Sequence, residues 1–475
     1  MQDNISVRGS AGSPLRSRAL NGGVLLTDDA GHFLLADKGR ARRIGSGEID
    51  ATDRVALARS GLAPTTELGA LAHRFARARR RGPPRPLDYL ILVPTLRCNL
   101  ACSYCQVSRA PETGSGFDWD EATLNAVRRL VAGLEARAVK IEFQGGEPTL
   151  RPDLLQAVID AVPEGVEPSF VICSNLQVLD ETVLALFDRP DVSISTSLDG
   201  PADLHARQRQ ADPARTARFF ANLDTLLERY GPSKISALPT IDPRSPPDPD
   251  ALIEAYASRG LDSIYLRPVN YQGFARKRHA HARETGEAWR AYHERFVRRL
   301  IALNFERRDR VLEETYFSLL LRRIFRQGAD RHVDLRNPNP VGRDYLVVDH
   351  DGRIYPTDEA RMLARSRVID LSIGDVFKGW DTPERAALEA AATLDGDPAC
   401  ERCTYKPYCG RDLVDDLARY GTVAVPRETT EFCRRHLHLF DLAFELIHSD
   451  DAAVRYSLNR WLGLSTDAPR LGLAA

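Results

Sequence analysis

Three cysteines lie close together in the segment TLRCNLACSYCQVSRA, residues 95–110. Cys98, Cys102 and Cys105 follow the spacing CxxxCxxC, with no fourth cysteine nearby. A structural zinc site uses four ligands and a disulfide uses two cysteines. Three thiolates can instead hold three irons of a cubane cluster and leave the fourth iron to an exogenous ligand. From the spacing alone, a zinc site completed by a distant residue and unligated cysteines remain alternatives.

A second set of cysteines lies near the C-terminus. Cys400, Cys403 and Cys409 have the spacing CxxCx5C, and Cys433 follows. Four cysteines suit either a closed iron–sulfur cluster or a zinc knuckle, and without further context the zinc site is favoured. The sequence thus contains two metal-like cysteine sets, which argues against a disulfide framework.

Short polar segments follow several apolar runs. GGEP, residues 145–148, combines two glycines that allow a close backbone approach with a carboxylate and a rigid turn. Ser174 and Asn175 offer hydroxyl and amide groups that suit ribose oxygens. Ser197 begins SLDGP, and Arg209 follows in a position to pair with a ligand carboxylate. Taken singly, each segment is equally compatible with a turn, a strand-end cap or a polar loop.

Six apolar runs predict the strands that would position these groups: residues 88–94, 139–143, 168–174, 192–198, 234–240 and 263–269. Helical patterns lie between them. The alternation predicts an α/β fold, a partial (β/α)6 TIM-like barrel. Chemistry in such barrels gathers at the carboxyl ends of the strands, so four polar loops from four strands would meet at one mouth.

Outside the barrel, the sequence predicts a small N-terminal module, a helical linker and a C-terminal cysteine domain. A hairpin is expected over residues 23–36, and helices are expected over 51–62, 65–80, 287–305, 311–326 and 431–448. DYLVVDHDGRIYP, residues 344–356, predicts a second hairpin that turns at Asp-Gly. The predicted domains are residues 1–85, 86–275, 276–343 and 344–475.

Composition excludes several classes of partner. The formal net charge is −1, so no overall field attracts nucleic acid or an acidic membrane. No apolar run reaches the roughly 18 residues that a membrane span needs. The N-terminal residues lack an apolar signal core, and together with metal-bound thiolates this favours a reducing, cytoplasmic location.

The order of CxxxCxxC, GGEP, SN and SxDG after successive strands resembles the radical S-adenosylmethionine (radical SAM) superfamily over about residues 86–275. The resemblance implies an enzyme with a [4Fe–4S] cluster on Cys98, Cys102 and Cys105, whose open iron binds the amino and carboxylate groups of S-adenosylmethionine. In that superfamily the reduced cluster cleaves the cofactor to a 5′-deoxyadenosyl radical, which removes a hydrogen atom from the substrate.

The resemblance also implies roles for individual residues. Those expected to bind the cofactor are Tyr104, Gly145, Gly146, Glu147, Ser174, Asn175, Ser197 and Arg209. Tyr104 would lie near the adenine, and the GGE residues would meet the methionyl amino end. Gln106 replaces the aromatic residue that is common after the third cysteine, so an adenine contact is not expected there.

The C-terminal part resembles the SPASM extension, which normally carries two auxiliary clusters. Here YPT (residues 355–357) replaces YPC, and Leu413 stands where another cysteine is expected. We therefore expect one auxiliary [4Fe–4S] cluster, on Cys400, Cys403, Cys409 and Cys433, and two clusters in all. Asp358 occupies the position of a proton acceptor in SPASM sulfatase maturases; an Asp that stabilises the turn is the alternative.

The segments CQVSRA, SLDGPADLHARQR and YPTDEARML resemble the His-Xaa-Ser system radical maturases, specifically their B-type member. The resemblance implies a ribosomally made peptide substrate that receives a modification such as a crosslink, a second radical maturase as partner and an external electron donor. The N-terminal hairpin would bind a leader peptide by adding a strand, or the module would cap the barrel. Two other functions stay open: sulfatase-maturase-like oxidation of a Cys or Ser, and a zinc-dependent binding protein without catalysis.

Three further residues suggest no site by themselves. Cys173, in FVICSN, is expected to be a buried strand cysteine. His279 and His281, in a basic segment, are expected to be solvated rather than metal ligands.

Overall fold

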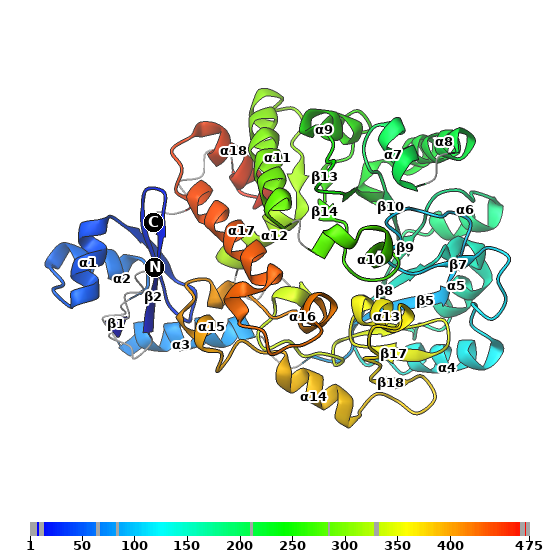
Figure 1. Ribbon diagram of the computed structural model, residues 1–475, viewed down its shortest axis with the longest axis horizontal. Helices are drawn as coiled ribbons and strands as arrows, with labels where there is room; N and C mark the ends of the chain where they lie inside the picture. Colours follow the sequence, from blue (N-terminus) through cyan, green and yellow to red (C-terminus); the bar gives the residue numbers. More distant parts are fainter. Residues whose placement is uncertain are drawn as a thin grey trace.

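The structure is a computed structural model that describes residues 7–8, 14–62, 67–81, 85–209, 212–283, 286–326, 332–465 and 471. The N-terminal module lies at one end of the molecule and the barrel strands lie at the other (Figure 1). The long helices α11 and α17 lie between them (Figure 1). Within the described residues, no helix combines the length and the apolar character needed to cross a membrane.

The central sheet has eight strands in the order β11-β10-β9-β8-β5-β16-β17-β18. Their bounds are β5 (Tyr89–Thr95), β8 (Ala138–Gly145), β9 (Glu167–Cys173), β10 (Val192–Ser197), β11 (Ile235–Leu238), β16 (Tyr345–Val348), β17 (Arg353–Tyr355) and β18 (Gly374–Asp375). The first six strands in this order run parallel to their neighbours. In β5 every residue after Tyr89 is buried, as expected for an apolar strand covered on both faces. The predicted α/β barrel fold is confirmed.

Helices alternate with these strands along the chain. They are α4 (Glu121–Ala132), α5 (Pro152–Ile159), α6 (Glu181–Phe187), α7 (Ala202–Arg209), α8 (Pro213–Tyr230) and α9 (Pro249–Ala257). Val127, Val131, Leu155 and Val158 from α4 and α5 lie in one hydrophobic core with Ile141 of β8. The helices thereby hold the carboxyl ends of the strands at a common edge.

The sixth predicted strand is not continuous. Residues 263–269 form two short strands, β13 (Ser263–Ile264) and β14 (Arg267–Pro268), and β14 pairs in parallel with β12 (Thr240–Ile241). Pro239 separates β11 from β12, and Pro268 lies within β14. The β12–β14 pairing tolerates Pro268, because the neighbouring residues donate instead: Arg267 N donates to Pro239 O and Val269 N donates to Ile241 O.

The predicted C-terminal hairpin is present and also extends the barrel sheet. β16 and β17 are antiparallel, while β16 pairs in parallel with β5 from Tyr345↔Tyr89 to Val348↔Leu92. All four residues of β16 are buried. A local sequence pattern predicts the hairpin but not this long-range pairing.

The C-terminal half contains further helices, of which α15 and α17 carry Cys400 and Cys433. They are α10 (Ala275–Arg278), α11 (Gly286–Glu306), α12 (Thr315–Phe325), α13 (Asp358–Arg365), α14 (Pro383–Ala391), α15 (Pro398–Arg402), α16 (Leu413–Tyr420), α17 (Glu431–Ile447) and α18 (Ala452–Trp461). The helices expected over 287–305, 311–326 and 431–448 correspond to α11, α12 and α17. β15 (Glu313–Glu314) precedes α12, so that helix begins later than expected.

The N-terminal module is a four-stranded antiparallel sheet with three helices. The strands are β1 (Val7–Arg8), β2 (Pro14–Leu20), β3 (Gly23–Thr27) and β4 (Phe33–Ala36), and the helices are α1 (Lys38–Ser46), α2 (Ala51–Arg59) and α3 (Glu67–Arg81). The predicted hairpin is β3–β4. α1 was not predicted; it starts at the N-cap Asp37, which accepts a hydrogen bond from Arg40 N, and ends at Gly47 with a positive φ of 80°.

The N-terminal module binds directly to the loop that carries Cys403 and Cys409. Arg18 of β2 forms an ion pair with Asp441 of α17, with Nη2 and Oδ2 2.6 Å apart, and Tyr405 O–H donates to Asp441 Oδ1 at 2.6 Å. Thr27 O–H donates to Thr404 O, and Tyr408 O–H donates to Gly31 O. The module therefore braces the second cysteine set.

Replacing Arg18 with Ala tests this bracing. The Arg18 and Asp441 side chains are only 18% and 26% exposed, so we expect Arg18→Ala to lower the free energy of unfolding by about 1–3 kcal/mol. Arg207→Ala is the matched control, because its ion pair with Asp203 is exposed and should contribute less than about 0.5 kcal/mol. Urea denaturation of both variants measures the difference; equal effects would contradict the bracing role.

Candidate functional site

The first cysteine loop is anchored by a partly buried charge network. Asp118 accepts hydrogen bonds from Thr95 O–H (2.5 Å), Arg97 Nε (2.8 Å) and Arg151 Nη1 (2.8 Å). Burial alone would raise the pKa of Asp118, but these hydrogen bonds lower it to about 2. The carboxylate therefore stays ionised and fixes the backbone immediately before Cys98.

One cavity of about 210 Å³ lies at the carboxyl ends of the barrel strands and includes all three cysteines of the loop. Every residue predicted to bind the cofactor also lines it: Tyr104, Gly145, Gly146, Glu147, Ser174, Asn175, Ser197 and Arg209. These residues come from four strand ends, so the structure brings the predicted site residues together. Their individual contacts with a ligand stay predictions.

Two glycines allow the GGE loop to pack against the backbone of the cysteine loop. Gly146 N donates to Thr95 O at 3.0 Å, and Glu147 N donates to Arg97 O at 2.7 Å. A Cβ at Gly145 would lie 2.2 Å from Thr95 O, and one at Gly146 would lie 2.2 Å from Arg97 O. Gly145 also has a φ of +143°. Side chains at these positions would push the two loops apart.

Glu147 ties the second and third strand ends together. Its side chain is buried; Oε2 accepts from Asn175 N at 2.7 Å and Oε1 accepts from Thr149 O–H at 2.7 Å. Burial raises the pKa of Glu147 more than these hydrogen bonds lower it. Glu147 thus positions the loop as well as facing the cavity.

Donors surround the first cysteine. Leu100 N lies 3.4 Å and Asn175 Nδ2 lies 3.7 Å from Cys98 Sγ. Burial, followed by the Glu147 carboxylate, raises the pKa of the Cys98 thiol to about 12. A thiol in this setting becomes a thiolate at neutral pH when a metal binds it, and N–H donors to sulfur are typical of iron–sulfur sites.

Arg209 supplies an unsatisfied donor at the cavity. Its Nη1 donates to Ser197 O at 3.3 Å, while its Nε is buried and has no hydrogen-bond partner within the described protein. A buried guanidinium N–H without a partner is costly, and a ligand carboxylate would satisfy it. Tyr104 lies beside it, with its O–H donating to Asp199 Oδ2 at 2.8 Å.

The two cavities bring different numbers of thiols together. Cys98, Cys102 and Cys105 line the first cavity, which is one thiol fewer than a closed tetrahedral zinc site uses and suits a cubane with one iron open to another ligand. The four cysteines of the second set also line one cavity, and four thiolates suit a closed cluster.

The second cysteine set lines a cavity of about 660 Å³, which also includes residues of β2, β3 and α1. Cys400, Cys403, Cys409 and Cys433 all line it. Thr430 Oγ1 accepts a hydrogen bond from Cys433 N at 3.2 Å, which fixes the start of α17. Arg427 forms a buried ion pair with Asp416, and its Nε has no partner within the described protein. This cation near the thiols would offset part of the negative charge of a bound cluster.

Asp358 lies outside the lining of the first cavity. Its Oδ1 accepts from Arg361 Nε at 2.8 Å and lies 2.7 Å from Arg361 Nη2. Arg361 is fully buried and also lies 3.7 Å from Asp349. The ion pair gives Asp358 a structural role at the start of α13, and its action as a proton acceptor stays a prediction.

The neighbouring Glu359 has a raised pKa. Burial and the charges of Asp334 and Asp358 raise the pKa of this carboxyl group to about 7.

Some cavity residues were missed or misjudged from the sequence. Cys173 is not sealed inside its strand; it lies at the end of β9, lines the cavity and approaches Glu142 Oε1 at 3.5 Å. Arg267 lines the cavity from the interrupted sixth strand. His281, expected to be solvated, is only partly exposed and lies 3.1 Å from Asp242 Oδ1. Each of these contacts joins residues far apart in sequence, and no local pattern signals it.

Comparisons with known proteins agree with this site. Residues 92–265 match the Radical SAM superfamily, so this part of the chain is a radical SAM domain. A GTP 3′,8-cyclase of Chlorobaculum tepidum is 34% identical over 116 residues, which are 24% of this chain and 34% of the cyclase. An uncharacterized protein of Methanocaldococcus jannaschii is 28% identical over 117 residues, covering 24% of this chain and 39% of that protein. The match thus spans little more than a third of these curated relatives.

Solved structures show the same fold over more of the chain. anSMEcpe with bound AdoMet has a TM-score of 0.59 and 17% identity, covering 76% of this chain and 97% of that chain. anSMEcpe with AdoMet and the Cp18Cys peptide also has a TM-score of 0.59, with 16% identity and the same coverage. Sequence identities of 16% and 17% show a shared fold and carry no conclusion about function. The comparisons support the expectation of an enzyme built on a radical SAM barrel.

Iron analysis tests the two-cluster expectation. We expect about eight irons per anaerobically reconstituted chain, and about four after Ala replacement of either Cys98, Cys102 and Cys105 or Cys400, Cys403 and Cys409. Cys173→Ala is the control and should retain full iron. Iron and sulfide are measured per chain. A count near twelve would indicate a third cluster and contradict the expectation.

The raised pKa of Glu359 predicts that the stability of the fold depends on pH. Its folded pKa of about 7 lies above the ordinary 4.5, so its contribution to stability is complete below pH 4.5 and is lost as the pH rises through 7. Ionisation then costs up to about 3 kcal/mol. We expect Glu359→Gln to be more stable than wild type at pH 8 and similar to it at pH 5, as measured by urea denaturation. An equal difference at both pH values would show that the Glu359 charge is not responsible.

Proposed function

We propose that this chain is a radical SAM peptide maturase, which removes a hydrogen atom from a ribosomally made peptide to install a modification such as a crosslink. The observation that carries the proposal is the first cavity. There, three cysteines on one loop share a small space with the GGE loop and an arginine N–H that has no protein partner.

Different residues that line this cavity would bind different parts of the cluster and the cofactor. Cys98, Cys102 and Cys105 would hold the cluster and leave one iron to S-adenosylmethionine. The Arg209 guanidinium would receive the cofactor carboxylate, and Gly145 and Gly146 would leave room for its methionyl end. Bound there, the cluster and cofactor supply the hydrogen-abstracting chemistry.

The N-terminal module supports a peptide as the substrate. Its sheet ends in two edge strands, β1 and β4, and an extended peptide can add to such an edge through backbone hydrogen bonds. Phe33 of β4 contacts Phe444 of α17, with ring centroids 5.1 Å apart. A peptide held at this sheet would therefore be tethered beside the auxiliary cavity.

The finer assignment to His-Xaa-Ser peptides rests on the sequence resemblance of CQVSRA, SLDGPADLHARQR and YPTDEARML. In this proposal a second radical maturase acts on the same peptide, and an external donor supplies the electron that reduces the catalytic cluster. The bond formed in the peptide depends on where the peptide enters the barrel mouth.

Cofactor cleavage and peptide modification can be measured in one anaerobic assay. Reconstituted protein, S-adenosylmethionine, a strong reductant and a peptide with His-Xaa-Ser repeats are incubated together. We expect 5′-deoxyadenosine from wild type and from the exposed-site control Arg207→Ala, but none from the Cys98→Ala, Cys102→Ala, Cys105→Ala variant. Mass spectrometry should show a peptide that has lost two hydrogens.

The formation of 5′-deoxyadenosine and the change in peptide mass test different parts of the proposal. Formation of 5′-deoxyadenosine without a change in peptide mass would retain the radical enzyme and reject this peptide class. Absence of 5′-deoxyadenosine from protein with a fully loaded catalytic cluster would reject radical catalysis and favour a binding protein.

A further inference from the structure

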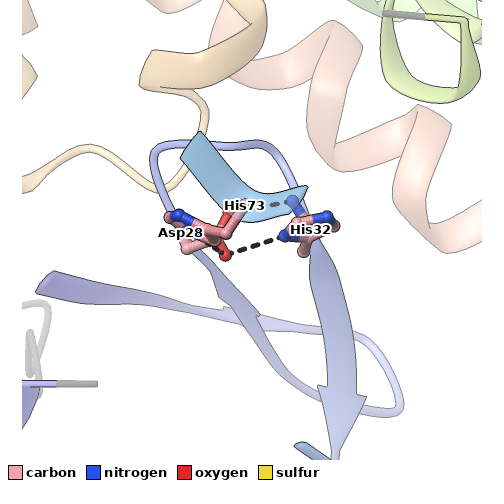
Figure 2. A group of neighbouring side chains, drawn as sticks. All are labelled: Asp28, His32 and His73. Carbon is pink, nitrogen blue, oxygen red and sulfur yellow. Dashed lines mark hydrogen bonds and ion pairs between the residues drawn. The ribbon is translucent and has the colours of Figure 1, made fainter. Parts of the chain in front are cut away.

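A compact group of three side chains lies in the N-terminal module, apart from both cysteine sets. Asp28 and His32 belong to the turn between β3 and β4, and His73 belongs to α3. Both imidazole rings point toward the Asp28 carboxylate (Figure 2). Their ligand atoms all lie within 4.8 Å of one another.

The geometry converges on a single carboxylate oxygen. His32 Nδ1 lies 3.0 Å and His73 Nε2 lies 2.9 Å from Asp28 Oδ2. Asp28 Oδ1 is already used, because it accepts from His32 N at 2.9 Å. The arrangement brings two imidazole nitrogens to one carboxylate oxygen, and a backbone hydrogen bond fixes the orientation of the carboxylate.

These separations match a metal coordination sphere. At metal–ligand distances of about 2.1 Å, adjacent donors lie about 3.0 Å apart in an octahedral site and about 3.4 Å apart in a tetrahedral one. The observed N–O separations of 2.9 and 3.0 Å fit the octahedral value. A tetrahedral site would require the donor atoms to shift by a few tenths of an ångström.

The surroundings leave room and charge for a cation. Asp28 is 1% exposed and His73 is 7% exposed, whereas the His32 side chain is 27% exposed, which leaves a solvent-facing position for a water ligand. A Cβ at Gly61 would lie 2.9 Å from the His32 ring, so glycine there gives the ring its space. The nearby cations Arg16 and Arg77 pair with Asp29 instead of Asp28.

We propose that Asp28, His32 and His73 bind a divalent first-row transition-metal ion, with water completing the coordination. Two imidazoles and one carboxylate are a ligand set that such ions accept. The ion links the β3–β4 turn to α3. Because Gly31 of the same turn accepts from Tyr408 O–H at 3.0 Å, the metal stiffens the surface on which the Cys409 loop rests.

Zinc serves as the probe in full-length protein whose iron–sulfur clusters are already loaded. We expect one tightly held Zn²⁺ per chain after removal of excess metal. Its X-ray absorption spectrum should show only nitrogen and oxygen neighbours at about 2.0–2.2 Å, whereas zinc captured by cysteines would show sulfur at about 2.3 Å.

Variants connect the ion to these residues. His73→Ala and Asp28→Asn should each lose the bound zinc and the rise in melting temperature that zinc gives the wild type. His281→Ala is the matched control, because it disrupts the comparable Asp242, His279 and His281 group and should retain the zinc. His32 is more exposed than Asp28 and His73. His32→Ala therefore provides a further variant if the other two substitutions prevent folding.

Three results would overturn the proposal: no zinc beyond that bound by sulfur, zinc retained in both His73→Ala and Asp28→Asn, or zinc lost only in His281→Ala. In each case the three side chains form a hydrogen-bonded cluster, with Asp28 accepting from both histidines, and no metal site. Because these readouts do not use catalysis, they are independent of the proposed function.

Discussion

The close approach of two loop backbones organises the barrel mouth. The GGE loop after β8 donates two backbone hydrogen bonds to the cysteine loop after β5, and this contact is possible only because residues 145 and 146 lack side chains. Glu147 extends the contact to the third strand end through Asn175 N. Asp118 holds the cysteine loop from the other side. Three strand ends are thereby fixed around one small cavity before any cofactor binds.

The second cysteine set depends on a different kind of support. Cys400 and Cys433 lie in the helices α15 and α17, Cys403 and Cys409 lie in the loop after α15, and the N-terminal module supplies part of the wall of their cavity. The Arg18–Asp441–Tyr405 network and the Tyr408–Gly31 hydrogen bond join segments that are more than 350 residues apart in the sequence. Peptide recognition by the N-terminal sheet, as proposed, would therefore take place beside the auxiliary cavity, although the module is closer in sequence to the catalytic cysteines.

Local patterns predicted the barrel strands well because buried parallel strands leave continuous apolar runs, as in LILV of β5. The residues of the first cavity were also predictable, since each follows a strand and parallel strands share one carboxyl edge. The prediction failed where distant segments decide the outcome. β16 joins the sheet beside β5, and the sixth predicted strand is divided into β13 and β14, of which β14 pairs with β12 and β13 pairs with β15.

The central claim is that Cys98, Cys102 and Cys105 hold a cluster with one iron open to S-adenosylmethionine. Electron paramagnetic resonance of the reduced protein tests it directly when the Cys400→Ala, Cys403→Ala, Cys409→Ala variant is used, because the catalytic cluster is then the one that contributes the signal. We predict that S-adenosylmethionine changes the spectrum and that cofactor labelled with ¹⁷O in its carboxylate and ¹⁵N in its amino group shows hyperfine coupling to the cluster. A spectrum that is unchanged at saturating cofactor would contradict the account.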